Sequence, residues 1–183
     1  ADDNSQYIEI ETSPVSVNLT QVPYQKLSDY HFFKGELKNQ IPEDGVLPYK
    51  PISTLFTDYA LKKRFVWMPK GSKATYNTDD TILELPVGAA LIKSFYYENV
   101  QPNNTTRIIE TRVMIRKSQG WIFAEYVWNQ EQTEAYLNML GSTTSISFKN
   151  DADQIINVPQ YDIPNESQCI ICHKERILNT NGT

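Results

Sequence analysis

The stretch from residue 107 to 128 constrains the fold most, because it reads as two β-strands joined by a tight turn. Apolar and polar residues alternate along Arg107–Lys117 and again along Trp121–Trp128, and Ser118-Gln119-Gly120 separates the two runs. Alternation with a period of two is typical of a strand that has only one face against a core. The first run is predicted to direct Ile109, Thr111, Val113 and Ile115 to one face and Glu110, Arg112, Met114 and Arg116 to the other.

Further strand-like runs lie on both sides of this hairpin. Lys63–Met68 is aromatic and β-branched, and Ala89–Tyr97 is apolar enough for a buried strand. Good helix formers followed by Gly141 predict one short helix over Asn129–Met139. We therefore predict a mainly β, antiparallel, sandwich-like domain with one or two short helices and an irregular C-terminal tail. A last strand pair is predicted over Ser142–Phe148 and Gln154–Val158, a short strand over Tyr7–Glu11, and a helical turn near Ser28.

Composition argues against two classes of partner. The net charge of −5 argues against nucleic acid, whose binders carry a basic face. No apolar run approaches the roughly 18 residues of a membrane span, so no transmembrane segment is predicted. With 183 residues, of which 40% are hydrophobic, the chain can bury one substantial core.

Both cysteines of the chain lie in one motif, Cys169-Ile170-Ile171-Cys172-His173. C-x-x-C-H is the attachment sequence of c-type haem, in which two thiols bond to one porphyrin and the histidine binds iron. We expect haem c, attached covalently through Cys169 and Cys172, with His173 as the proximal iron ligand. The main alternative is a disulfide or redox Cys pair before an unrelated histidine. A zinc site is weaker, because no further ligand pair completes it.

The motif also bears on location and on the division of the chain. Haem attachment to C-x-x-C-H takes place outside the cytoplasm, and Ala1-Asp2-Asp3-Asn4 looks like the start of a processed chain. We therefore expect a periplasmic, extracellular or cell-surface protein whose export signal has been removed. We divide the sequence into an N-terminal extended segment (1–26), a β domain (27–160) and a haem-attachment tail (161–183).

A set of short motifs spans most of the chain in a fixed order. They are Leu27-Ser28-Asp29-Tyr30, Pro48-Tyr49, Leu55-Phe56-Thr57-Asp58-Tyr59-Ala60, Lys63-Arg64-Phe65, Pro86-Val87-Gly88, Ile92-Lys93-Ser94-Phe95-Tyr96-Tyr97, Glu110-Thr111-Arg112, Tyr126-Val127-Trp128-Asn129 and, before Cys169, Pro164-Asn165-Glu166-Ser167-Gln168. In order and spacing they resemble a family of exported bacterial proteins, described mostly as conserved hypothetical or repeat proteins. Some members adjoin, or are fused to, domains similar to quinone-dependent sugar dehydrogenases. The resemblance implies export and a C-terminal haem. His31 departs from the family pattern, and family members usually continue well past the haem motif.

The sixth ligand of the iron has several candidates. His31 and His173 are the only histidines, so a second imidazole would come from His31 of this chain or from a neighbouring molecule. The plainer interpretation of His31 is a surface or aromatic-cluster residue. A methionine ligand would raise the reduction potential relative to a second histidine, and an open site would admit small ligands. The methionine candidates are Met68, Met114 and Met139.

Other chemistry is less well supported by the residues. Glu110 and Glu125 on neighbouring strands offer a carboxylate pair for glycoside hydrolysis, but a structural network with Arg112, Lys93 or Arg64 is the favoured interpretation. The acidic pairs Asp79-Asp80 and Asp151/Asp153 are expected to be solvated turns rather than calcium sites. The tryptophans are expected to pack in the core or against haem rather than to form a sugar platform; they are Trp67, Trp121 and Trp128.

These observations predict an exported monohaem c-type cytochrome that carries single electrons, and so an electron-transfer protein rather than an enzyme. Its partner would be a redox protein, and a homo-oligomer or filament that brings haems together is a further expectation. The alternative is an extracellular carbohydrate-binding or glycan-processing β-sandwich with a structural Cys pair. A fibre subunit without haem is a third hypothesis.

Overall fold

The computed structural model describes residues 13–53, 56–79 and 81–168. All strand pairings are antiparallel, so the prediction of a mainly β, antiparallel domain is confirmed. The described strands are β1 (Phe33–Lys34), β2 (Ile41–Pro42), β3 (Val46–Pro48), β4 (Leu61–Trp67), β5 (Ala90–Val100), β6 (Thr105–Lys117), β7 (Gly120–Trp128), β8 (Ala135–Leu137), β9 (Ser142–Lys149) and β10 (Ile155–Ile163), and the 3-10 turns are η1 (Leu27–Tyr30) and η2 (Leu37–Asn39).

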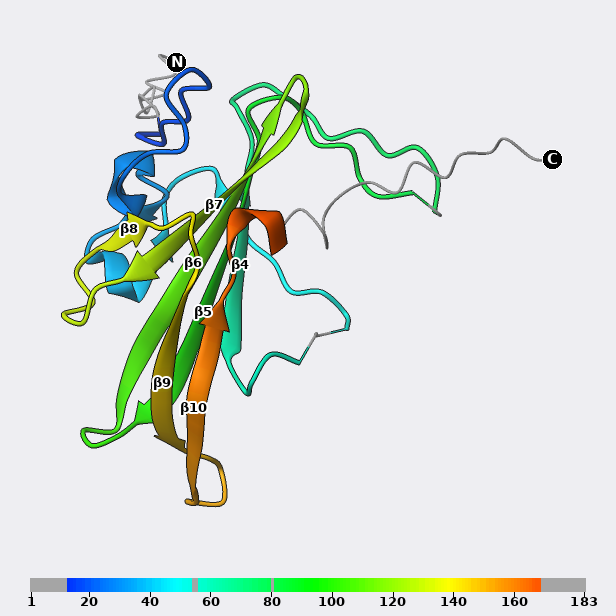
Figure 1. Ribbon diagram of the computed structural model, residues 1–183. Helices are drawn as coiled ribbons and strands as arrows, with labels where there is room; N and C mark the ends of the chain where they lie inside the picture. The colour runs from blue at the N-terminus through cyan, green and yellow to red at the C-terminus, as the bar shows by residue number, and fades with distance from the viewer. Residues whose placement is uncertain (1–12, 54–55, 80, 169–183) are drawn as a thin grey trace, which may run out of the picture.

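β5 is the centre of the main sheet, whose strand order is β10-β9-β5-β6-β7-β8. β6 pairs with one edge of β5 from Ala90 to Val100. The other edge is shared by two strands, because β4 pairs with residues 90–96 and β9 joins at Val100, opposite Phe148. β3 pairs with the outer edge of β4. As a result β9 and β10 turn across the lower part of the long strands, in front of β5 and β6 in Figure 1.

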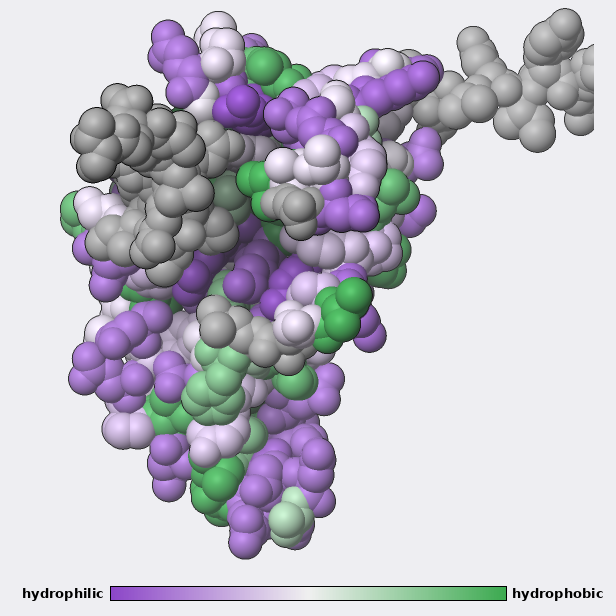
Figure 2. Space-filling model, turned by 90° about the vertical axis from the view of Figure 1, so that its right-hand side faces the viewer, coloured by the Kyte–Doolittle hydropathy of each residue, from purple (hydrophilic) through white to green (hydrophobic). Residues whose placement is uncertain are grey.

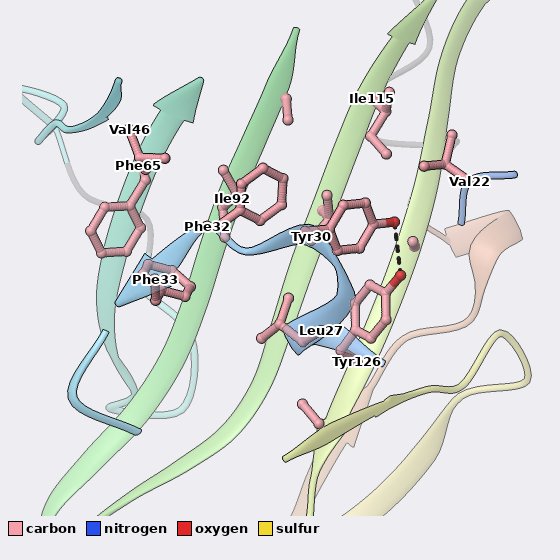
Figure 3. Close-up of a cluster of buried hydrophobic side chains, with 14 of the residues drawn as sticks. Val22, Leu27, Tyr30, Phe32, Phe33, Val46, Phe65, Ile92, Ile115 and Tyr126 are labelled. Carbon is pink, nitrogen blue, oxygen red and sulfur yellow. Dashed lines mark hydrogen bonds between the residues drawn. The ribbon is translucent and has the colours of Figure 1, made fainter. Parts of the chain in front are cut away.

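The N-terminal segment covers one face of this sheet. Side chains of Leu27, Tyr30 and Phe32 are buried against strand residues such as Ile92 and Tyr126 (Figure 3). The hydroxyl groups of Tyr30 and Tyr126 are 2.9 Å apart, and the Tyr126 hydroxyl donates to the carbonyl of Tyr24 at 2.8 Å. Partly buried residues further toward the N-terminus pack on the same cluster, so part of the extended segment contributes to the core; they are Val15, Val17 and Leu19.

The opposite face is covered by β9 and β10. Phe95 and Tyr97 of β5 pack with Phe148 of β9 and Tyr161 of β10 in a second buried cluster. The central strands therefore lie between two layers, which gives the sandwich-like arrangement expected from the alternating sequence. β10 continues to Ile163, so the β structure extends three residues past the boundary at 160.

A β-bulge changes one predicted side-chain direction. Phe95 lies opposite Glu110 but Tyr96 lies opposite Ile108, so Ile109 is an extra residue in β6. Ile109 was expected on the face of Thr111 and Val113, but it packs in the second cluster with Phe95. One inserted residue reverses the alternation locally.

The helix predicted over Asn129–Met139 is wrong. The Asn129 Oδ1 atom accepts hydrogen bonds from the backbone N–H groups of Thr133 (2.9 Å) and Glu134 (3.1 Å), which closes a turn. Gln132 has a left-handed φ of 58°, which a helix interior excludes. β8 then pairs with β7, with Tyr136 opposite Val127.

Two further predictions concern the N-terminal strand and membrane-spanning segments. The strand expected over Tyr7–Glu11 lies outside the described residues. Among the residues that are described, no helix is both long and apolar enough to cross a membrane.

Candidate functional site

The structure describes the chain up to Gln168, so Cys169, Cys172 and His173 lie just outside the described residues. Helical backbone begins at residue 166. The Asn165 Oδ1 atom accepts the backbone N–H of Gln168 at 3.0 Å, and the Gln168 Oε1 atom accepts the backbone N–H of Asn165 at 2.9 Å. Such a reciprocal pair is a capping box, which stabilises the first turn of a helix. The C-x-x-C-H motif therefore follows directly after a capped helix start.

The segment that leads into the motif is fixed against the loop between β8 and β9. The backbone N–H of Glu166 donates to the Met139 carbonyl at 3.4 Å. Gly141 has a φ of 75°, and a Cβ atom there would lie 2.9 Å from the Ile163 carbonyl oxygen and 3.0 Å from the Asn165 nitrogen. Both the conformation and the close approach require glycine at this position.

An open apolar hollow lies beside this loop. It has a volume of about 570 Å³ and is lined by the end of β7, by β8 and by the loop itself. Leu140 is 90% exposed and Tyr136 is 49% exposed, and Leu137 and Met139 also line the hollow. Exposed apolar side chains that gather at one place are typical of a surface that binds an apolar partner. This surface is therefore a candidate for binding an apolar ligand or partner.

His31 lies at the C-terminal end of η1, with a left-handed φ of 55° and its backbone N–H bonded to the Ser28 carbonyl at 3.0 Å. Its side chain is exposed, whereas the neighbouring rings of Tyr30 and Phe32 are buried and stacked 4.9 Å apart. His31 is therefore a surface residue and no part of the aromatic cluster. Its role as a distal ligand, in its own chain or for a neighbour, stays a prediction.

The three methionine candidates lie in different places. Met139 lines the hollow beside the helix start, and its carbonyl accepts the hydrogen bond from Glu166. Met114 lines a separate pocket on the sheet face, and Met68 follows the end of β4. Among these, the structure brings Met139 next to the residues that precede the haem motif.

The predicted carboxylate pair is part of a structural ion-pair network. Arg112 approaches Glu110 through Nη2 at 2.7 Å and Glu125 through Nε at 3.2 Å. Glu110 is fully buried, Glu125 is 2% exposed, and the Tyr161 hydroxyl donates to Glu110 at 2.6 Å. Burial acts to lower the pKa of Arg112, but Glu110 and Glu125 outweigh it and raise the pKa. The favoured interpretation is confirmed: one partly buried guanidinium neutralises two buried carboxylates.

The features that would support a sugar site are placed unfavourably. Trp128 is buried, and its indole N–H donates to the Thr111 hydroxyl at 2.9 Å. Trp121 lies under the Arg116 guanidinium, 5.9 Å from the ring centroid. The exposed rings of Phe56 and Tyr59 meet edge to face, so they do not form one flat platform.

Two of the acidic turn residues interact with neighbouring side chains. Asp153 pairs with Lys149 at 2.8 Å, and Asp79 accepts a hydrogen bond from the Tyr76 hydroxyl. Within the described ranges, no group of three or more His, Cys, Asp or Glu side chains could hold a metal ion.

The sequence did not reveal that basic residues form a row across the sheet. The strand register places Arg64 of β4 opposite Lys93 of β5, and Lys93 opposite Arg112 of β6. Burial, together with the charges of Arg112, Arg64 and Lys62, lowers the pKa of Lys93 to about 8. The available signal was a lysine within the apolar run Ala89–Tyr97, but its neighbours depend on the pairing of β4 with β5.

Comparison of the chain with protein-family models, with curated proteins and with solved structures found no match.

Proposed function

We propose that this chain is an exported monohaem c-type cytochrome that carries single electrons, located in the periplasm or at the cell surface. Cys169 and Cys172 form the thioether bonds, and the His173 imidazole is the proximal ligand. When bound, haem c supplies an iron that accepts and releases one electron. The β domain acts as the scaffold that holds this group and presents it to a redox partner protein.

The observation that carries the proposal is the position of the motif directly after the capping box of Asn165 and Gln168. Cys169, Cys172 and His173 have the spacing i, i+3, i+4, which places three side chains on one face of a helix. A helix that continues from residue 166 would turn both thiols and the imidazole toward the same ligand. The cap and the contact with Met139 hold the residues that immediately precede the motif.

The apolar hollow beside the loop that contacts Glu166 supports the same function. Tyr136, Leu137 and Leu140 would cover part of the porphyrin and exclude water from the iron. Tyr136 and Leu140 expose apolar area to water, and covering that area would stabilise a complex by about 25 cal/mol per Å².

The test is co-expression of the exported full chain with a c-type haem maturation system, followed by absorption spectra and haem staining after denaturing electrophoresis. We expect sharp reduced bands and a stain that stays with the denatured chain. The Cys169→Ala/Cys172→Ala variant should fold, judged by circular dichroism, and carry no stain. A wild-type chain that is colourless after this expression would overturn the proposal.

We assign the sixth ligand to Met139 or His31, and the spectrum distinguishes them. Met139→Leu should abolish a methionine-to-iron absorption band if Met139 is the ligand, whereas the matched control Met114→Leu should not. His31→Ala should change the low-spin spectrum if His31 is the ligand. If that histidine comes from a neighbouring molecule, the change should depend on protein concentration, as expected for a homo-oligomer or filament.

A further inference from the structure

A second pocket lies on the face of the sheet that carries Arg112. Its volume is about 240 Å³, and its polar lining consists of Tyr49, Arg64, Lys93 and Arg112. The apolar lining includes Leu91, two residues before Lys93 on β5, and Met114, two residues after Arg112 on β6. Phe123 of β7, opposite Met114, completes it. Figure 2 faces the side of the molecule that carries β4 and shows a hollow with strongly hydrophilic residues in it.

The charged groups around this pocket do not balance. The cations that face it or flank it are Lys62 and Arg64 on β4, Lys93 on β5 and Arg112 on β6, and the anions are Glu110 on β6 and Glu125 on β7. Both carboxylates form ion pairs with Arg112. In the part of the chain that the structure describes, Arg64 and Lys93 have no ion-pair partner. Two positive charges are left over in a chain whose net charge is −5.

The state of Lys93 reflects this excess. Its amine lies 4.7 Å from the centroid of the Phe95 ring, and burial and neighbouring cations lower its pKa to about 8. A bound anion would offset both effects, because an opposite charge within a few ångströms favours the charged form of an amine. The pocket is therefore arranged to gain from an acidic ligand.

The lining indicates the class of ligand. Arginine matches a carboxylate through two parallel hydrogen bonds, and the apolar side chains match a hydrocarbon body. Pockets for drug-sized ligands measure roughly 300–1,000 Å³, so about 240 Å³ accepts only a small acid or the acid end of a larger one. We propose that Arg64 and Lys93, next to the already paired Arg112, form a binding site for the carboxylate of an amphiphilic organic acid.

Two sources could supply that carboxylate, and they share this chemistry. One is a free organic acid. The other is a haem on the same chain, whose propionates are carboxylates on an apolar macrocycle; this source alone rests on the proposed function. A chain of contacts links the pocket to the helix start. Glu125 pairs with Arg112, and the Glu125 carbonyl accepts the Asn138 N–H at 2.8 Å. The carbonyl of Met139, the residue after Asn138, accepts the N–H of Glu166.

The first experiment uses the full chain as Cys169→Ser/Cys172→Ser, which cannot attach haem, and measures acylation of the Lys93 amine at pH 8 by peptide mass spectrometry. Lys63 is the internal reference, because it lies next to Arg64 in sequence and points to the other face of β4. Butyrate and acetate are the probes. If the acid raises the pKa of Lys93 from about 8 to about 9, the free amine at pH 8 falls from about one half to about one tenth. Lys93 acylation should therefore slow about fivefold while Lys63 is unchanged.

The apolar lining predicts how the affinity for an acid depends on the length of its hydrocarbon chain. Each methylene that enters the pocket should tighten binding about fourfold, so butyrate should protect Lys93 at a lower concentration than acetate. Arg64→Gln should remove the protection. Arg116→Gln is the matched control, since Arg116 lies on β6 outside the lining and should leave protection unchanged. Equal protection in both variants, or none in the parent chain at either acid, would overturn the site as a receptor for free acids.

The second experiment separates the two sources. Lys93 of the haem-loaded wild-type chain is acylated without any added acid. Protection relative to the Cys169→Ser/Cys172→Ser chain, lost in Arg64→Gln but not in Arg116→Gln, assigns the carboxylate to the haem. If Lys93 of the haem-loaded chain is fully reactive but butyrate protects it, the carboxylate is that of a free acid. Full reactivity without protection in either chain overturns the inference, and the absorption spectrum judges haem attachment independently.

Discussion

Arg112 neutralises two buried carboxylates, so the stability of the sheet depends on this one side chain. Arg112→Met leaves Glu110 and Glu125 without their cation in a dry environment, and breaking a buried ion pair in this way costs about 3–5 kcal/mol. We expect a loss of that size in the free energy of unfolding from urea denaturation. Arg116→Met, on the same strand, should cost less than about 1 kcal/mol. Adding Glu110→Gln and Glu125→Gln to Arg112→Met should recover part of the loss; a lack of recovery would contradict the network.

Lys93, unlike Arg112, destabilises the folded chain at neutral pH, because its folded pKa of about 8 lies below the unfolded value of 10.5. Between these values the unfolded chain binds more protons, so the stability contributed at this residue rises with pH from about 8 to about 10.5, and below pH 8 the full penalty remains. Lys93→Met should therefore be more stable than its parent at pH 7, by about 1 kcal/mol after allowance for solvent screening at a half-buried site. The advantage should shrink toward pH 10. Urea denaturation of the Cys169→Ser/Cys172→Ser chain across this range tests it, and a constant difference would contradict it.

At the scale of elements, the turn between β8 and β9 holds the segment that precedes Cys169. Gly141→Ala must overcome both a left-handed conformation and a contact of 2.9 Å with the Ile163 carbonyl oxygen. Gly35→Ala is the matched control, since Gly35 has a φ of 72° with no atom near its Cβ position. We expect Gly35→Ala to lower the free energy of unfolding by about 1 kcal/mol because of its conformation alone, and Gly141→Ala to lower it by at least twice as much. Thermal denaturation measures the difference; equal losses would mean that the loop moves freely away from Ile163.

The elements also show which parts of the fold a sequence can reveal. The pairing of β6 with β7 was predictable because a tight turn fixes the register, and this register alone places Arg112 opposite Glu125. The bulge at Ile109 and the strand β8 could not be predicted, because each depends on contacts with a distant partner that override local preference.

Some features of the candidate site could likewise be predicted from the sequence, and others could not. The haem motif and the acidic pair are local in sequence or joined by the hairpin, so they could be recognised. The row of Arg64, Lys93 and Arg112 needs the register of β4 against β5, and a long connection separates those strands. The cap at Asn165 was not predicted, although the sequence contains the Asn-x-x-Gln pattern of a capping box. The attachment of this segment to Met139 follows only from the fold.

At the scale of the whole molecule, the two buried clusters lie on opposite faces of one sheet and share β5 and β6. Phe32 belongs to the first cluster, under the N-terminal layer, and Phe148 belongs to the second, under β9 and β10. Because both layers pack on the same long strands, neither should unfold while the other stays intact.

Phe32→Ala and Phe148→Ala should therefore each lower the midpoint of one common transition, by about 3 kcal/mol in the free energy of unfolding. Far-ultraviolet circular dichroism follows the strands. Tryptophan fluorescence, measured in a Trp67→Phe/Trp121→Phe background, reports on Trp128, which lies in the first cluster. The two signals should coincide in urea for the parent chain and for both variants, with unchanged slopes. In particular, Phe148→Ala should shift the fluorescence transition although Trp128 lies on the other face of the sheet. A fluorescence midpoint that stays in place while the circular dichroism midpoint falls would mean that the two layers unfold separately.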